Sequence, residues 1–312
     1  MKKTIIAASI AAVVAAPAAF ADVKISGQIN QEFFQTDAAN NGITDNDLVV
    51  DRNTDIVVSV SEDLDNGMKA FATISLVDDA SSNTDKSNNT NTVAANGTVD
   101  GAGMGSGSTQ IVGLATDFGT ITMGKQELFI ESKAAAMAAN DAADFLSNEV
   151  STSVGETAEG NLEYTSPSMG GFKAVVSVRG EAAGDDFDKT GFGVEYSNAG
   201  LLVRAATMDD NGTDTDVLGV QYSMGDLKMG IVSAEEGASA RQTWYGASYK
   251  MGNNELAVST TDSSSRAAKD TIVSLKHSLS KNVAAYIVYE DDSAAAAAND
   301  GSTTLVGMQV KF

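Results

Sequence analysis

The hydrophobic residues of this chain recur at every second position over many short stretches. In the final ten residues, TTLVGMQVKF, the even-numbered positions from Thr304 to Phe312 are mostly apolar, and the odd-numbered ones are mostly small or polar. Because successive side chains of a β-strand point to opposite faces, this stretch predicts a strand with one apolar face. Such a face needs an apolar surrounding, which is either a protein core or a lipid bilayer.

The same period of two returns in DVKISGQINQEF near the start, in GFKAVVSVRG at mid-chain and in GDLKMGIVSA after it. Counting such segments predicts about sixteen strands. We expect them near residues 22–36, 48–62, 67–79, 108–118, 119–126, 160–167, 171–180, 188–198, 200–208, 214–223, 225–235, 240–251, 253–261, 270–279, 281–290 and 303–312.

The connections between these strands alternate in length. Tight turns at 198–200, 223–226 and 279–282 are separated by longer polar loops. Short turns on one side, long loops on the other, and strands that alternate apolar and polar residues are typical of transmembrane barrels with a polar lumen. The pattern predicts an all-β, 16-stranded antiparallel transmembrane β-barrel that forms a single domain over residues 22–312.

The first residues predict export from the cytoplasm. Lys2 and Lys3 precede an apolar run over 5–16, and the small residues Ala19 and Ala21 follow. This order is typical of a cleaved signal peptide, here residues 1–21. The alternative is an N-terminal helical anchor, but the run is shorter than the roughly 20 residues that a spanning helix needs.

Composition narrows the function classes. The chain has no cysteine, which excludes disulfides and thiolate chemistry. Its net charge of −22 argues against nucleic acid as a partner. No apolar run of about 18 residues follows residue 21, which excludes helical spans but leaves a membrane barrel open.

Catalytic and metal chemistry finds little support. The single histidine, His277, shares its strand face with Val273 and Leu275, which indicates a membrane-interface residue rather than a general base. Zinc sites usually draw on cysteine or several histidines. We expect no cofactor, apart from calcium loosely bound at acidic outer loops such as 290–292, where the alternative is a solvated charge run.

Two long connections stand out. Residues 80–107 are almost entirely small or polar and are expected to form a surface loop; their GAGMGSG lacks the lysine and the helix of a phosphate-binding loop. Residues 127–159 contain SKAAAMAANDAADFL, with Ser132 placed as an N-cap of a short helix. The acids of this second segment are Glu127, Glu131, Asp141, Asp144, Glu149, Glu156 and Glu159, against the single base Lys133. Folded into a water-filled barrel, the segment would narrow the opening and set its charge.

Several stretches resemble the trimeric general porins of Gram-negative outer membranes. SEDLDNGMKA at 61–70 is similar to the family's turn between strands two and three, and LATDFGTITMGKQ at 114–126 to its hairpin ending in Gly-Arg-Gln. LEYTSPSMGGFKAVVSV at 162–178 resembles the Tyr-x-Ser-Pro turn, and HSLSKNVAAYIVY at 277–289 the late Leu-Ser-Lys hairpin. The terminal Phe312 also resembles the final aromatic of the family.

The resemblance implies a homotrimer of sixteen-stranded barrels. The third long loop, here 127–159, would fold inward as the constriction, and the second, here 80–107, would reach over a neighbouring subunit as a latch. Phe312 would be the signal that the barrel assembly machinery reads. The surroundings would be the lipids and lipopolysaccharide of the outer membrane.

The constriction implied in this way has an acidic and a basic side. On the acidic side we expect Glu127, Glu131, Asp141, Asp144 and Glu149. On the basic wall we expect Lys69, Lys125, Lys173, Arg179 and Arg204. Strand parity places four of these bases in the lumen, all except Lys125. Parity groups Lys125 with Ile121 and Met123, so only the resemblance implies a lumen position for it. The chain also departs from the family here, because Lys125 stands for the arginine of Gly-Arg-Gln and an arginine typical of strand two is replaced near Asp55.

The function we predict is an outer-membrane channel for passive diffusion of small hydrophilic solutes and ions, with a preference for cations and no enzymatic activity. One alternative is an enzymatic barrel of the protease or lipase type, which would need a usable base in the lumen or at the rim. Another is an acidic surface adhesin, which would show repeats or tandem sandwich domains. A solute-specific channel is a further alternative within transport.

Overall fold

The computed structural model describes residues 21–36, 48–51, 54–78, 104–130, 158–180, 189–210, 212–239, 241–263, 269–293 and 301–312. The signal segment and most of the two long loops, 80–107 and 127–159, therefore lie outside the described residues. Within the described part of the chain, no helix is long and apolar enough to cross a membrane.

Most of the described residues form one antiparallel sheet whose strands are joined by turns. A single 3-10 turn, Asp65–Gly67, links two of its strands. The strands are β1 (Ala21–Thr36), β2 (Leu48–Asp51), β3 (Thr54–Asp63), β4 (Lys69–Asp78), β5 (Met104–Thr116), β6 (Gly119–Gln126), β7 (Ala158–Thr165), β8 (Phe172–Arg179), β9 (Lys189–Asn198), β10 (Leu201–Asp210), β11 (Thr213–Met224), β12 (Leu227–Glu236), β13 (Gln242–Met251), β14 (Asn254–Ser263), β15 (Lys269–Ser278), β16 (Val283–Ser293) and β17 (Gly301–Lys311).

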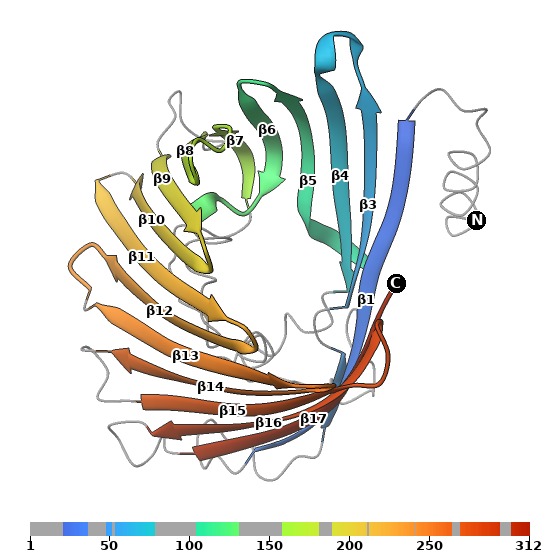
Figure 1. Cartoon of the computed structure of the whole chain (residues 1–312), viewed down its shortest axis with the longest axis vertical. Coiled ribbons are helices and arrows are strands. Elements are labelled where there is room, and N and C mark those ends of the chain that lie inside the picture. The colour runs from blue at the N-terminus through green and yellow to red at the C-terminus, as the bar shows by residue number, and fades with distance from the viewer. Residues whose placement is uncertain are drawn as a thin grey trace, which may run out of the picture.

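The sheet closes on itself. From β3 to β17 each strand pairs with the next, and β1 pairs with β17 on one side and with β2 and β3 on the other. In Figure 1 the ribbons follow one another around a ring, and β17 returns to the side of β1. Because β2 and β3 are two pieces of the strand predicted over 48–62, the ring has the sixteen positions that the sequence predicted.

The turns at one end of the barrel are tight. In the β9–β10 hairpin, Asn198 pairs directly with Leu201, and the two residues between them, Ala199 and Gly200, have φ values of 47° and 86°. Two successive positive φ angles match the twist of a two-residue hairpin. A Cβ on Gly200 would lie 2.3 Å from the carbonyl oxygen of Ser223, so this position accepts only glycine.

The two faces of the strands differ in the way the sequence predicted. On β17, Val306 and Met308 are 48% and 50% exposed, while Leu305 and Gln309 on the opposite face are 0% and 6% exposed. Large apolar side chains on the outside of a closed ring need an apolar surrounding. The barrel therefore has its lipid-facing surface outside and its polar side chains within.

The seam between the first and last strands is held by side chains as well as by the ladder. Tyr286 of β16 reaches across β17 and donates a hydrogen bond of 2.6 Å from its hydroxyl to Glu32 Oε1 of β1. The residue between them in the pairing is Gly307, where a Cβ would lie 2.4 Å from Cζ of the tyrosine ring. Glycine at this position lets three strands be connected by one side chain.

We expect Tyr286→Phe to lower the stability of the closed barrel. The substitution keeps the ring but removes the hydroxyl that donates to the fully buried Glu32 carboxylate. Loss of this hydrogen bond lowers the free energy of unfolding by about 1–3 kcal/mol. The measurement is the temperature at which the folded band converts to the unfolded band on gels of samples heated stepwise. The control is Tyr245→Phe, because Tyr245 lies exposed on the outer face; equal transition temperatures for both variants would contradict the prediction.

Candidate pore lining

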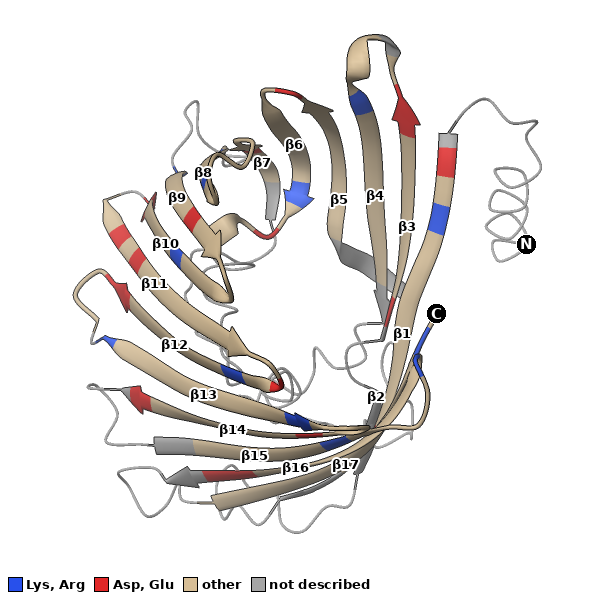
Figure 2. Cartoon of the chain, viewed as in Figure 1, with Lys and Arg blue, Asp and Glu red and all other residues tan. Residues whose placement is uncertain are grey.

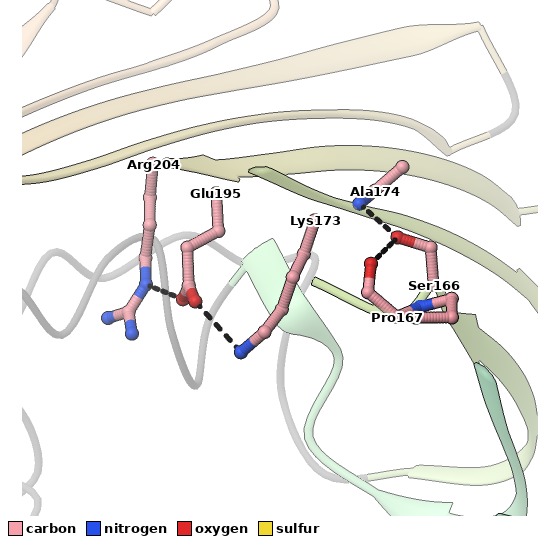
Figure 3. A network of polar contacts seen from close by, with 6 residues as sticks. All are labelled: Ser166, Pro167, Lys173, Ala174, Glu195 and Arg204. Atoms are coloured by element: carbon pink, nitrogen blue, oxygen red, sulfur yellow. Dashed lines mark hydrogen bonds and ion pairs between the residues drawn. The ribbon is translucent and has the colours of Figure 1, made fainter. Parts of the chain in front are cut away.

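Three charged side chains on neighbouring strands form a cluster on the lumen wall. In the pairing register, Lys173 of β8 lies opposite Glu195 of β9, which lies opposite Arg204 of β10. Lys173 Nζ lies 3.1 Å from Glu195 Oε1, and Arg204 Nε donates to Glu195 Oε2 at 2.8 Å (Figure 3). One carboxylate thus neutralises part of the charge of two bases.

The local sequence explains why these side chains face inward. Lys173 alternates with the outward Phe172, and Glu195 alternates with the outward Tyr196. The rings of Phe172 and Tyr196 contact each other, with centroids 4.5 Å apart, which fixes the β8–β9 pairing on the lipid side. The turn before β8 is tied to the strand, since the N–H of Ala174 in β8 donates to the hydroxyl of Ser166 in the turn at 2.9 Å, as Figure 3 also shows.

Two other bases also have acidic partners: Lys189, which the sequence analysis did not name, and the predicted wall residue Lys69. Lys189 Nζ lies 2.6 Å from Asp210 Oδ2, and both side chains are mostly buried. Lys69 Nζ lies 3.6 Å from Asp63 Oδ1 next to a short turn, where both side chains are well exposed. Arg179 lies on the same face, in register with Lys189. Figure 2 shows acidic and basic bands interspersed along the strands rather than gathered on one of them.

The lumen wall also carries an apolar patch that the sequence interpretation did not predict. Its residues belong to β8 and β10–β13 and share strand faces with the charged lumen residues: Val175, Ala206, Met208, Val217, Val232, Ala234 and Trp244. Leu128, Phe129 and Ile130, which follow β6, pack against this patch and are 0%, 7% and 4% exposed. The beginning of the predicted constriction loop therefore lies inside the barrel.

Polar contacts hold the same part of the chain. The backbone N–H of Phe129 donates to Glu163 Oε2 of β7 at 3.0 Å, and the side-chain amide of Asn161 donates to the carbonyl of Gln126 at 2.6 Å. Sequence reasoning missed Glu163 and Glu195 as pore-lining residues. Strand parity could have found both, because each stands between two outward apolar residues.

The described residues contain no group of three or more histidine, cysteine, aspartate or glutamate side chains that could hold a metal ion. Residues 290–292, where we expected calcium to bind at an outer loop, belong to a strand, because β16 continues through Ser293. Glu290 is buried and Asp291 is exposed, as expected for successive residues of a strand, whose side chains point to opposite faces.

The comparison with protein families decides between the alternative barrels. The profile described as Gram-negative porin matches residues 7–304, nearly the whole chain. The chain belongs to the Gram-negative porin family. This porin is therefore an outer-membrane channel for passive diffusion and not an enzyme. None of the curated proteins matches its sequence.

Solved structures give the same fold. The porin is similar to an anion-selective porin from Comamonas acidovorans, at 17% identity and a TM-score of 0.68, covering 94% of this chain and 100% of that one. It is also similar to OmpF of Salmonella typhi in complex with daunomycin, at 14% identity, TM-score 0.67 and coverages of 93% and 97%. A trimer form of OmpT from Vibrio cholerae matches at 10% identity, TM-score 0.65 and coverages of 94% and 99%.

The porin's predicted constriction acids are described only in part. Glu127 is exposed and directly precedes the buried Leu128. The other acids expected there lie outside the described residues: Glu131, Asp141, Asp144 and Glu149. The helix expected over 132–146 lies outside them as well.

Two further site residues of the porin lie at the ends of strands. Lys125 pairs in register with Gln110 and lies on the same strand face as Met123, not on the face of Gly124. The β6–β7 pairing shifts by one residue between Gly124 and Gln126. The pairing therefore gives no support for a lumen position of Lys125. Phe312 lies beside β1: its N–H donates to the carbonyl of Gly27, and its carbonyl accepts from the N–H of Gly27, both at 3.0 Å.

Proposed function

We propose that this porin carries small hydrophilic solutes and prefers cations over anions. The observation that carries the proposal is the cluster of Lys173, Glu195 and Arg204, in which one carboxylate contacts both bases. Lys189 is paired with Asp210 in the same way. Wall bases whose charge is partly compensated by carboxylates attract anions less than unpaired bases would.

The acidic loop supplies the other half of the argument. Residues 127–159 carry seven acids and one base, and Leu128–Ile130 lie against the lumen wall. In a narrow gap with low-dielectric walls, charges a few ångströms from an ion act strongly, whereas charges on outer loops are screened within about 8 Å at physiological salt. An excess of carboxylates in such a gap favours cations.

The anion selectivity of the Comamonas porin does not transfer to this chain. At 17% identity the likeness concerns the fold alone, and ion preference depends on individual charges within it. Here the acids of the loop and the pairing of the wall bases both act in the direction of cations.

We expect the reversal potential under a potassium chloride gradient to show cation preference, which falls as salt rises. Glu195→Gln should shift it toward chloride, because Lys173 and Arg204 then lose their shared carboxylate. The matched control is Glu235→Gln, which also removes an acid that contacts an arginine, Arg241, but on the outer face. A native channel that prefers chloride, or equal shifts for the two variants, would contradict the proposal.

The loop's share in this preference is tested by changing Glu131, Asp141, Asp144 and Glu149 to the matching amides. A fourfold variant with native selectivity would exclude these acids from the constriction.

We further propose that the porin assembles as a homotrimer, with residues 80–107 as a latch and its apolar outer face against outer-membrane lipid and lipopolysaccharide. The trimer form of Vibrio cholerae OmpT supports this assembly for a barrel of the same fold. On gels of unheated detergent extracts we expect a species much larger than the boiled monomer. Monomer mobility in both samples would argue against the trimer.

Phe312 is proposed as the signal for the barrel assembly machinery. Deleting it removes both the aromatic ring and the two backbone hydrogen bonds to Gly27, whereas Phe312→Ala removes only the ring. We expect both variants to reach the outer membrane at a several-fold lower yield under strong expression. Loss confined to the deletion would assign Phe312 to the seam and not to recognition.

A further inference from the structure

The apolar patch on the lumen wall has a single described occupant. Polar side chains line the lumen of most water-filled barrels. Here Val175, Val217, Val232 and Trp244 are each at most 4% exposed, and Leu128–Ile130 pack against them. Docking of this segment removes apolar surface of both partners from water, which favours the docked position.

Gly193 of β9 forms the seat for the central residue of the segment. A Cβ at Gly193 would lie 2.3 Å from Cδ1 and 2.5 Å from Cε1 of Phe129. Gly193 pairs with Val175 on one side and with Ala206 on the other. The ring of Phe129 therefore lies over a gap between two small or medium-sized side chains, and this gap exists because position 193 has no side chain.

The backbone around the ring is fixed independently of the apolar contact. Glu163 accepts from the N–H of Phe129, and Asn161 donates to the carbonyl of Gln126. Both polar partners come from β7, which is separated from β9 and its Gly193 by one strand, β8. Contacts to β7, β9 and the apolar patch thus determine where the chain runs after β6.

We propose that Phe129 is a positioning residue of the permeation path. Its ring, seated on Gly193, holds the segment from Glu127 to Ile130 against the wall, and so gives the lumen a steady width and Glu127 a fixed place. The proposal rests on the channel function of the porin but not on its ion preference. Loss of the ring lets the segment sample several positions in the lumen.

The test compares Phe129→Ala, the conservative Phe129→Leu and the control Phe192→Ala. Phe192 is next to the seat in sequence but is 51% exposed on the outer face. In single-channel recordings, Phe129→Ala should raise the open-channel current noise several-fold and add conductance sublevels. Phe129→Leu should restore a steady current, and Phe192→Ala should match the native channel.

Trp244 provides a second measurement, which reports whether the segment still covers the apolar patch. It is the single tryptophan of the chain, and it is 4% exposed within the patch. In folded Phe129→Ala its emission should shift to longer wavelength, and acrylamide, a neutral quencher, should reach it more readily. The same changes are expected for Gly193→Val, which fills the seat and alters no charge.

Folding is checked first by gel mobility before and after heating. Folded Phe129→Ala and Gly193→Val channels with native noise and native tryptophan emission would overturn the proposal. It would also be overturned if neither Phe129→Ala nor Phe129→Leu formed a folded barrel, since the ring would then serve assembly. A native preference for chloride together with noisy Phe129→Ala channels would refute the proposed ion preference and leave the positioning role intact.

Discussion

The structure depends on the closure of one hydrogen-bonded ladder. In the hydrocarbon region of a bilayer no water is present to bond backbone N–H and C=O groups, so a sheet can span it only without free edges. Here β1 meets this requirement on both sides, with β17 on one edge and β2 and β3 on the other. Closure gives every strand an outer face towards lipid and an inner face towards the lumen, and the inner faces together form the pore lining.

Glycines on the inner face determine where aromatic rings lie. Phe71 lies over Gly113, Tyr286 over Gly307 and Phe129 over Gly193, and in each pair a Cβ on the glycine would come within 2.4 Å of the ring. A strand glycine often marks such a close approach. These rings therefore lie close against the wall, where a side chain at the glycine position would push them into the lumen.

The period of two predicted the strands, the ring of sixteen positions and the orientation of most wall residues, because one lipid face and one lumen face impose alternation on every strand. It did not predict the cluster around Glu195. The two bases that contact Glu195 lie on the two neighbouring strands, so the contacts depend on the register in which the strands pair. The hydrophobic pattern of one strand carries no information on that register. The apolar patch was missed for a related reason. Consecutive apolar residues such as Ile231 and Val232 indicate a strand covered on both faces, and a search for a period of two does not register this signal.

The hydrogen bond from the Tyr286 hydroxyl to Glu32 also bears on the order in which the strands of the barrel assemble. The two residues are 254 positions apart in the sequence, whereas the strands from β3 to β17 each pair with a neighbour in the chain. Contacts of such separation carry the largest entropic cost of loop closure and form late. Because the tyrosine reaches over Gly307, its bond needs β17 to be in place beside β1. The bond is therefore a mark of the finished barrel, formed when the last strand has closed the ring.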